Sequence, residues 1–366
     1  MQIIIYCGSI FNNDAIGNDV LIQYQYLNNY NIFTKLYAIS VDNSTKELIV
    51  SKQEFIDLIL DRDNILLIHY GSYWDNLFEH IKTAKCKVIL KYHNITPANF
   101  FKNYNKYLTL SLRDSRKKLE EIIQSGFIDY YWVDSYYNAE ELIANNVDEK
   151  NIKIIPPFHK IHDFDNVKID TELREQLNNG AYQMLFVGRV APNKGHKHLI
   201  ETIKSYKEEY GNNIHLNIIG SISCELRGYY KELKKLIKDY KLDDMISFYD
   251  HVTFEQLNTF YATADLFLLM SEHEGFCVPI LEAQYHNIPI IALDRAAVKE
   301  TLGEEQLIYE KIDYDVFASA IYTLTTEKEM HTYLAKQGYN NFLKYEGAKI
   351  AELMLTAVQD IIDMKE

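Results

Sequence analysis

The sequence is poor in cysteine, proline, glycine and long apolar runs. Its four cysteines are scattered over 366 residues without a Cys-x-x-Cys pair, which argues against a disulfide framework or a zinc ribbon. Six prolines and 14 glycines are too few for a collagen-like or low-complexity chain. The longest apolar runs, Asn64–His69 and Leu266–Met270, are far shorter than the roughly 20 residues of a membrane-spanning helix.

Basic residues are outnumbered by acidic ones, 38 against 52, so the formal net charge is −14. A dedicated nucleic-acid binder would carry a basic surface, so no nucleic-acid partner is expected. The segment Met1–Ile10 has no basic residues before its apolar stretch and does not resemble a signal peptide. We therefore expect a cytoplasmic protein with reduced cysteines.

Short β-branched apolar runs alternate with amphipathic stretches along nearly the whole chain. A first series of expected strands is Ile3–Gly8, Lys35–Ile39, Ile65–Tyr70, Val88–Tyr92, Tyr130–Val133 and Ile152–Ile155. A second series is Met184–Val187, His215–Ile219, Ile246–Tyr249, Leu266–Met270, Ile288–Leu293 and Gln306–Tyr309. Strands that alternate with helices form parallel sheets covered on both faces. The pattern predicts an α/β fold with two doubly wound parallel sheets.

The length of the chain favours two domains, because a single core rarely grows beyond roughly 250–300 residues. The passage Pro156–Gly180 is polar and carries no strand signal, so we interpret it as the linker. The expected domains are residues 1–160 and residues 161–345. Residues 346–366 are expected to form a helix that packs back on the N-terminal domain.

The loop after the expected strand Met184–Val187 carries charges suited to an anion. It runs from Gly188 to Gly195 and leads into an expected helix. A helix amino terminus offers free N–H groups and a positive dipole end, and Arg189 and Lys194 add full charges that can pair with a phosphate. The alternative is a surface loop with two solvated cations, because no established phosphate-binding glycine pattern is present.

A second loop follows the apolar strand Leu266–Met270. Pro279 is placed for the first turn of a helix, so the N–H groups of the preceding loop would face a ligand. Glu274 lies before this helix and Glu282 about one turn inside it. Two carboxylates at this spacing can serve a sugar at one end of a ligand and a ribose at the other. The alternative is that acidic residues only favour a helix amino terminus.

Two further candidates lie in the N-terminal half. His93 follows the expected strand Val88–Tyr92, and ligands bind outside the carboxyl ends of parallel strands; a structural role for a lone histidine is the alternative. In the loop Gly8–Asp19, Gly17 would let a ligand approach the backbone. Asp14 is placed as a helix N-cap.

Together these motifs resemble the family 4 glycosyltransferases, which are retaining enzymes with the two-domain GT-B fold. A Gly-Arg-x-x-x-x-Lys-Gly loop opens the second domain, and Glu-Gly-Phe-x-x-Pro-x-x-Glu follows it. The resemblance covers essentially the whole chain and is strongest over Phe186–Glu282. It implies two Rossmann-like domains that face a central crevice. The stretches Asp-Ala-Ile-Gly-Asn-Asp and His-Asn-Ile-Thr-Pro are similar to those of bacterial surface-polysaccharide enzymes described as mannosyltransferases.

The resemblance implies a role for each matched residue. Arg189 and Lys194 would hold the diphosphate of a nucleotide-sugar and stabilise it as the leaving group. Glu274 would contact hydroxyls of the donor sugar, Glu282 would bind the ribose, and His93 would lie beside the reacting sugar. The remaining donor-binding positions would be Gly188, Gly220, Ser221, His251, Val252, Gly275, Phe276, Cys277 and Val278. The loop residues bordering the phosphates and the acceptor would be Asp14, Gly17 and Asn18.

The chain departs from the family pattern at two positions. Cys277 stands where glycine is usual, and cysteine tolerates a left-handed backbone poorly. Only Gly17 follows Ile16 in a loop that usually carries two adjacent glycines, which weakens the inferred acceptor geometry.

The implied reaction moves a hexosyl group, with mannose from GDP-mannose as the leading expectation, to a glycan or polyprenyl-linked glycan. The product would be O-antigen, capsule or exopolysaccharide. Cationic side chains and helix amino termini can stabilise a departing diphosphate by themselves, so neither a metal nor a cofactor is expected. UDP-glucose, UDP-galactose and UDP-N-acetylhexosamine donors stay open, as do a sugar-nucleotide epimerase or hydrolase and a non-catalytic scaffold. The basic run Arg113–Lys118 predicts contact with anionic lipid at the inner face of the plasma membrane, unless it is only a solvated helix face.

Overall fold

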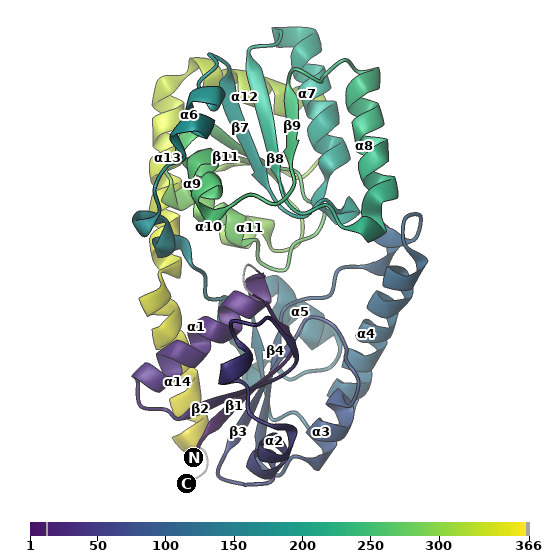
Figure 1. The fold of residues 1–366 in the computed structure, drawn as a ribbon, viewed down its shortest axis with the longest axis vertical. Helices are drawn as coiled ribbons and strands as arrows, with labels where there is room; N and C mark the ends of the chain where they lie inside the picture. The colour runs from purple at the N-terminus through teal and green to yellow at the C-terminus, as the bar shows by residue number, and fades with distance from the viewer. Residues whose placement is uncertain (12–13, 364–366) are drawn as a thin grey trace. The chain divides into compact units, whose positions relative to one another are not determined.

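The computed structural model describes residues 1–11 and 14–363 and divides into two compact units (Figure 1). Unit 1 comprises Met1–Ala98, Tyr107–Lys160 and Tyr345–Glu366, and unit 2 comprises Asn99–Lys106 and Ile161–Lys344. Each unit contains a six-stranded, entirely parallel sheet between helices. This confirms the predicted α/β fold with two doubly wound sheets. Asn12 and Asn13, within the loop Gly8–Asp19, lie outside the described residues.

Unit 1 has strand order β2-β1-β3-β4-β5-β6. Its strands are β1 (Ile3–Ile10), β2 (Thr34–Val41), β3 (Ile65–Tyr70), β4 (Lys87–Tyr92), β5 (Tyr130–Val133) and β6 (Ile152–Ile154). Its helices are α1 (Ala15–Asn29), α2 (Lys52–Ile59), α3 (Leu77–Thr83), α4 (Lys106–Gln124), α5 (Tyr136–Ala144) and α14 (Gly347–Asp363).

Alternate residues of β1 enter different cores, because successive side chains of a strand point to opposite faces of the sheet. Ile4 and Tyr6 belong to the core beneath α2, α3, α4 and α5. Ile3 and Ile5 belong to the core on the other face, which α1 and α14 cover. This second core includes Met354 of α14, so the carboxyl-terminal helix is part of unit 1.

Unit 2 has strand order β12-β11-β10-β7-β8-β9. Its strands are β7 (Tyr182–Val187), β8 (Ile214–Ile219), β9 (Ile246–Tyr249), β10 (Leu266–Leu269), β11 (Ile290–Leu293) and β12 (Leu307–Tyr309). Its helices are α6 (Thr171–Leu177), α7 (His196–Tyr210), α8 (Arg227–Asp239), α9 (Phe254–Thr263), α10 (Val278–Tyr285), α11 (Val298–Leu302), α12 (Tyr314–Thr326) and α13 (Lys328–Phe342).

One segment differs from the domain boundaries expected above. Residues 99–106 were assigned to the N-terminal domain, but they pack with unit 2. The Tyr104 ring lies edge-on against Tyr229, and the Tyr104 hydroxyl donates to Glu232 at 2.9 Å. Lys197 donates to the same hydroxyl at 3.0 Å. These contacts hold a loop of the first half of the chain on α7 and α8.

Candidate functional site

Each sheet has a topological switch point, on either side of which the chain adds successive strands in opposite directions. In unit 2, β7 lies between β8 and β10; in unit 1, β1 lies between β2 and β3. Ligands of open α/β sheets bind outside the carboxyl ends of the strands at such points. The loops after β7 and β10, and after β1 and β3, are therefore where ligand sites are expected.

Two of the predicted residues meet at the switch point of unit 2. Lys194, from the loop after β7, donates to both carboxylate oxygens of Glu274, from the loop after β10, at 2.8 and 2.7 Å. Gly195 makes this approach possible, because a Cβ atom there would lie 1.8 Å from the Met270 carbonyl oxygen. A cation and a carboxylate from separate loops are thus held at one point.

Arg189 supplies a second cation on the loop after β7. Its side chain is exposed and makes no hydrogen bond or ion pair within the described part of the chain. The helix α7 begins directly after this loop, at His196, and its amino terminus adds a partial positive charge. The arrangement offers an anion a free guanidinium and an ammonium that is shared with a carboxylate.

The ends of the neighbouring strands β7 and β8 are joined through the backbone. The Gly188 amide donates to Ile219 at 2.8 Å, and the Val190 amide donates to Ser221 at 3.0 Å. The Gly220 amide donates to the last residue of β9 at 3.0 Å. The structure therefore brings Gly188, Gly220 and Ser221 together.

His251 and Val252 follow β9 and are less closely tied to this group. His251 is exposed and lies 2.7 Å from an oxygen of its neighbour Asp250. Val252 is half-buried. Among the described residues, no hydrogen bond joins either of them to Gly188 or Gly220.

The turn from Gly275 to Val278 leads into α10. Cys277 is the N-cap of this helix, with φ 81° and ψ 71°, so the left-handed backbone implied by the glycine of the family pattern is present here. Burial raises the pKa of the Cys277 thiol well above its usual value, and the nearby Glu274 carboxylate acts in the same direction. The thiol is therefore protonated at neutral pH. The Phe276 carbonyl accepts a hydrogen bond from Thr301 at 2.6 Å, which fixes the turn.

Glu282 lies within α10 and accepts a 2.5 Å hydrogen bond from the hydroxyl of Tyr261 on α9. Burial raises the pKa of this carboxyl from its usual 4.5 to about 7, although the tyrosine hydrogen bond opposes the shift. The ionised form of such a poorly solvated carboxylate is stabilised by hydrogen bonds from hydroxyl groups. Tyr261 was not identified from the sequence, since its distance along the chain from Glu282 gives no signal.

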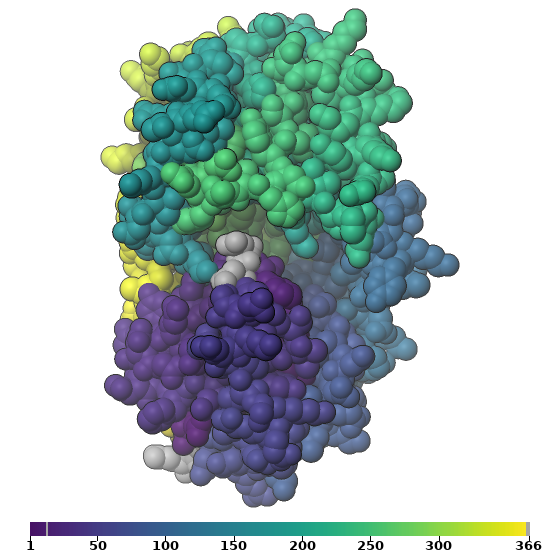
Figure 2. All heavy atoms as spheres, viewed as in Figure 1, coloured from purple at the N-terminus to yellow at the C-terminus, as the bar shows by residue number. Residues whose placement is uncertain are grey.

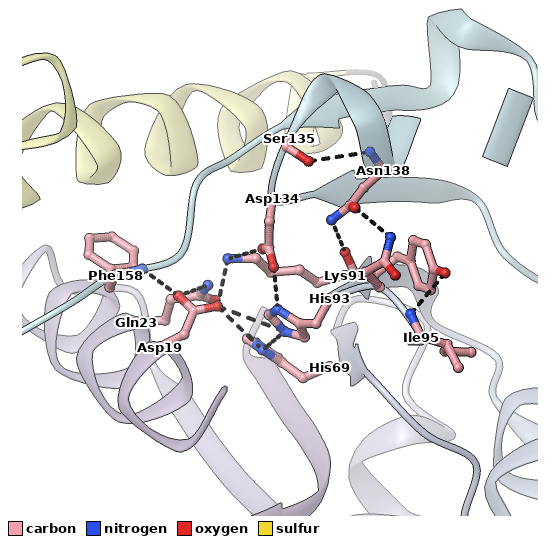
Figure 3. A network of polar contacts seen from close by, with 12 residues as sticks. Asp19, Gln23, His69, Lys91, His93, Ile95, Asp134, Ser135, Asn138 and Phe158 are labelled. Atoms are coloured by element: carbon pink, nitrogen blue, oxygen red, sulfur yellow. Dashed lines mark hydrogen bonds and ion pairs between the residues drawn. The ribbon is translucent and has the colours of Figure 1, made fainter. Parts of the chain in front are cut away.

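A network of buried polar side chains surrounds His93 in unit 1 (Figure 3). Lys91, fully buried in β4, donates to Asp19 of α1 at 2.6 Å. The other Asp19 oxygen accepts from Gln23 at 3.0 Å and from the Phe158 amide at 2.9 Å. The buried charges of Lys91 and Asp19 are thus paired and hydrogen-bonded, as buried charges must be.

His93 itself is held between two partners. Its Nδ1 lies 2.8 Å from an oxygen of Asp134, and its Nε2 lies 2.9 Å from Nδ1 of His69 (Figure 3). Of this network, only His93 was singled out from the sequence. A signal did exist, because Lys91 and His69 interrupt otherwise apolar strands and are paired in register between β4 and β3.

Asp19, His69 and His93 are also close enough to hold a metal ion, since their potential ligand atoms lie within 4.8 Å of one another. The Lys91 ammonium, however, lies 2.6 Å from the same Asp19 oxygen. A cation at this position would have to compete with that ion pair, so the arrangement fits an ion pair better than a metal centre.

The predicted loop residues lie at the start of α1. The Asp14 carboxylate accepts a hydrogen bond from the Gly17 amide at 3.2 Å, so Asp14 is the N-cap expected from the sequence. Gly17 is buried, and a Cβ atom there would lie 2.3 Å from the Phe11 carbonyl oxygen. The half-buried Asn18 has a side-chain oxygen without a partner among the described residues.

Comparison with known proteins gives one family match and several relatives. Residues 169–341 match the family model described as "Glycosyl transferases group 1". An O-antigen chain mannosyltransferase, RfbU of Salmonella typhimurium, is 26% identical over 222 residues, which cover 59% of this chain and 58% of that protein. A mannosylfructose-phosphate synthase of Agrobacterium fabrum is 31% identical over 146 residues, covering 39% of this chain and 32% of that protein. The chain thus spans a third to somewhat over half of these relatives.

The whole fold is shared with solved structures. A glycosyltransferase from Rickettsia africae superposes with a TM-score of 0.77 at 16% identity, covering 99% of this chain and 98% of that one. At this identity the likeness shows the fold alone. The two-sheet architecture of the GT-B glycosyltransferases is therefore that of this chain.

Proposed function

Residues 169–341 form a glycosyl transferases group 1 domain in a chain with the GT-B fold, and from this premise we propose that the protein is a hexosyltransferase. Its donor is a nucleotide-sugar, and its acceptor is a glycan or polyprenyl-linked glycan. The observation that carries the proposal is the Lys194–Glu274 pair, with contacts of 2.7 and 2.8 Å at the switch point of unit 2, and Arg189 on the same loop.

The chemistry of these residues fits the departure of a nucleoside diphosphate. Negative charge develops on the diphosphate as the sugar leaves, and prepositioned cations stabilise that charge in the transition state. Lys194 and Arg189 supply such cations, and the amino termini of α7 and α10 add partial charges. Because these groups can do so without a metal, we propose a metal-independent reaction that uses no cofactor.

The carboxylates are assigned to the two sugars of the donor. In the free protein, Glu274 is paired with Lys194; when a diphosphate attracts the ammonium, Glu274 becomes free to accept from donor-sugar hydroxyls. Glu282 accepts from the ribose hydroxyls in the same way that it accepts from Tyr261 at 2.5 Å. The remaining donor contacts are assigned to the loop ends Gly188, Gly220, Ser221, His251 and Val252 and to the turn Gly275–Val278.

The mannose donor is supported by the names of relatives. RfbU is an O-antigen chain mannosyltransferase, and the Agrobacterium protein is a mannosylfructose-phosphate synthase. We therefore propose GDP-mannose as donor and a role in bacterial surface-polysaccharide synthesis, with retention of the anomeric configuration. In a retaining transfer on one face of the sugar, a diphosphate oxygen takes the proton of the acceptor hydroxyl. His93, fixed by Asp134 and His69, would contact the transferred sugar.

Helix α4, whose residues are coloured blue in Figure 2, carries exposed apolar and basic side chains. Leu110 and Tyr107 are 52% and 80% exposed, and the exposed Arg113 and Lys117 lie near Leu110 at helical spacing. Exposed apolar and basic side chains on one helix face favour binding to the headgroup region of anionic bilayers. We propose that this face meets the membrane where a lipid-linked acceptor is held. No helix in the described part of the chain has the length and apolarity needed to span a bilayer.

The central test is a thermal-shift panel with GDP, UDP, dTDP and their hexose conjugates. At roughly 100 times its dissociation constant, a ligand adds about 2.7 kcal/mol of apparent stability. We expect one base to stabilise the wild type selectively and Lys194→Ala to lose the effect. Lys336→Ala, on an exposed site of α13, is the matched control.

The outcomes separate the alternatives. No stabilisation by any nucleotide would contradict the proposal and favour a non-catalytic scaffold. Nucleotide binding together with donor consumption that needs no acceptor would favour a hydrolase or epimerase. Stabilisation by a uridine nucleotide alone would keep the transferase but replace GDP-mannose with a UDP-linked sugar.

A further inference from the structure

A histidine of α7 contacts the same loop that carries Glu274. In this loop, residues 271–274, Ser271, His273 and Glu274 are buried, whereas the side chain of Glu272 is 36% exposed. The Nε2 atom of His198 lies 3.3 Å from an oxygen of the Glu272 carboxylate. His198 stands in the first turn of α7, which begins at His196. Neither His198 nor Glu272 is among the donor contacts assigned above.

The other ring nitrogen of His198 also faces a polar partner. Its Nδ1 lies 2.9 Å from the hydroxyl of Tyr314, the first residue of α12. An imidazolium donates from both ring nitrogens, and here an oxygen atom lies opposite each of them. The His198 side chain is only 18% exposed. The surroundings therefore accommodate a positively charged ring with both N–H groups directed at acceptors.

Glu272 owes the ionised state of its carboxyl group mainly to this ring. The hydrogen bond and the charge of His198 hold the pKa of Glu272 below its usual 4.5, although burial opposes the shift. Arg295 acts in the same direction to a smaller extent. Its guanidinium also donates to the carbonyl oxygens of Asp294 and Glu310, at 2.6 and 2.8 Å. His198 is thus the principal partner of the Glu272 charge.

The main chain fixes Glu272 beside the loop after β7. The Glu272 amide donates to the carbonyl oxygen of Asn193 at 2.8 Å, and the Asn193 side chain donates to the carbonyl oxygen of His273 at 3.4 Å. Lys194, the next residue, holds both oxygens of Glu274. The backbone of Glu272 is therefore joined to the loop that carries the cation assigned to the diphosphate, while its side chain contacts α7.

The loop 271–274 thus carries two negative charges, and each has its own partner. The Lys194 ammonium pairs with Glu274 and is also assigned to the diphosphate. If Glu272 had no partner, its charge would remain on the same loop and would repel an incoming diphosphate. A charge beside Glu272 that is not itself used for the donor removes this repulsion.

We propose that His198 is a positioning residue of the donor site. Its ring holds and neutralises the Glu272 carboxylate, so that the loop 271–274 presents Glu274 alone to Lys194 and to the donor diphosphate. The inference rests on the proposed transferase function and adds a residue that acts on the donor only through Glu272. Diphosphate affinity then depends on the summed charge of His198 and Glu272.

A double-mutant cycle measured by isothermal titration calorimetry tests this dependence. The probe is whichever of GDP, UDP and dTDP the thermal-shift panel selects, at about pH 6, where an ordinary imidazole is mainly protonated. His198→Asn leaves Glu272 without its cation and should weaken binding about fivefold. Glu272→Gln should bind at least as tightly as the wild type. The double variant should return to within about twofold of the wild type, because the summed charge is again zero.

Three further measurements separate an electrostatic role from a merely structural one. His198→Lys keeps a cation and should keep the affinity of the wild type. The loss in His198→Asn should shrink between roughly 50 and 500 mM KCl, because salt screens the repulsion. It should also be smaller for the corresponding nucleoside monophosphate, which carries less negative charge. His215→Asn, at the amino end of β8, is the matched control and should bind like the wild type.

The outcomes distinguish this inference from the function on which it rests. Wild-type protein that binds no nucleotide would contradict the proposed function. Nucleotide binding that His198→Asn leaves unchanged, or a loss that neither Glu272→Gln nor salt relieves, would overturn the role of His198 and leave the transferase intact. If His198→Asn does not fold, Glu272→Gln alone decides the question, since several-fold weaker binding by this variant would show that the Glu272 charge favours the diphosphate.

Discussion

At the scale of single residues, the environment of Glu282 links nucleotide binding to pH. Its pKa is raised to about 7 by burial, against a usual value of 4.5. A carboxyl whose pKa is raised in the folded protein contributes stability that is complete below its unfolded pKa and is lost as the pH rises through the folded pKa. The free protein therefore loses stability between about pH 4.5 and pH 7 because of this one group.

Nucleotide affinity should show the opposite trend, because only the ionised carboxylate can accept from both ribose hydroxyls. We expect the affinity for the selected nucleotide to fall about tenfold from about pH 8 to about pH 6. Glu282→Gln should bind the nucleotide more weakly and with a shallower pH dependence. Because the nucleotide itself also titrates, the pH dependence that remains in this variant serves as the internal control. Isothermal titration calorimetry measures both; parallel pH profiles in the two proteins would refute the assignment.

Cys277 has a left-handed backbone conformation, with φ 81°, which glycine adopts more readily than other residues. Left-handed backbone costs an L-residue roughly 1–2 kcal/mol, while glycine costs about 0.4–1 kcal/mol through the unfolded chain. Cys277→Gly should therefore stay within about 1 kcal/mol of the wild type, whereas the β-branched Cys277→Val should lose about 2 kcal/mol or more. Urea denaturation compares them, with Cys277→Ser as control for the thiol. Equal stability of the glycine and valine variants would contradict the strained backbone.

At the scale of elements, the basic residues of Arg113–Lys118 on α4 differ in how far they are engaged in contacts within the protein. Arg116 donates to the Ile95 carbonyl and pairs with Glu141 at 3.2 Å. Lys118 lies 2.8 Å from Glu121, and the more exposed Lys117 lies 3.8 Å from the other oxygen of the same carboxylate. Only part of the run Arg113–Lys118 therefore remains open to a lipid surface.

The membrane prediction accordingly concerns the exposed positions alone. Arg113→Glu with Lys117→Glu should reduce binding to phosphatidylglycerol vesicles several-fold in a flotation assay, since each cation near an anionic surface contributes about 1 kcal/mol. Lys328→Glu with Lys336→Glu, on exposed sites of α13, imposes the same change of charge on unit 2 and should have no effect. Equal binding by both double variants would remove α4 from the membrane contact.

The strands were the part of the fold that the sequence predicted best. Every expected strand is present, with its ends shifted by no more than two residues, because buried parallel strands are short, apolar and β-branched. The loops after β7 and β10 could be located for the same reason, since their glycine and charge patterns follow strands directly. The partners Tyr261, Asp134 and His69 could not be predicted, because they meet Glu282 and His93 only through tertiary packing.

At the scale of the whole molecule, unit 1 carries both tryptophans, Trp74 and Trp132. Tryptophan fluorescence therefore reports the unfolding of unit 1 alone, whereas nucleotide binding is assigned to unit 2. Fluorescence and nucleotide binding together allow the effect of a substitution on each unit to be measured separately.

Met354 tests the contribution of α14 to unit 1. It is fully buried in the core shared by α1, α14 and the sheet, so Met354→Ala should cost about 2–5 kcal/mol. The fluorescence-detected urea transition should move to lower concentration while nucleotide affinity stays unchanged. Leu353→Ala, on the same helix but 49% exposed, should behave like the wild type. An unchanged fluorescence transition for Met354→Ala would show that α14 does not contribute to the core.

The place of α14 in unit 1 also has a consequence for synthesis on the ribosome. Chains are made from the amino terminus at roughly 5–20 residues per second, and domains commonly fold in that order. Here residues 345–363, which complete the core of unit 1, follow the whole of unit 2 in the sequence. The nascent N-terminal half therefore waits with an open apolar face until α14 leaves the exit tunnel. During that interval it is the part of the chain that a chaperone would be expected to hold.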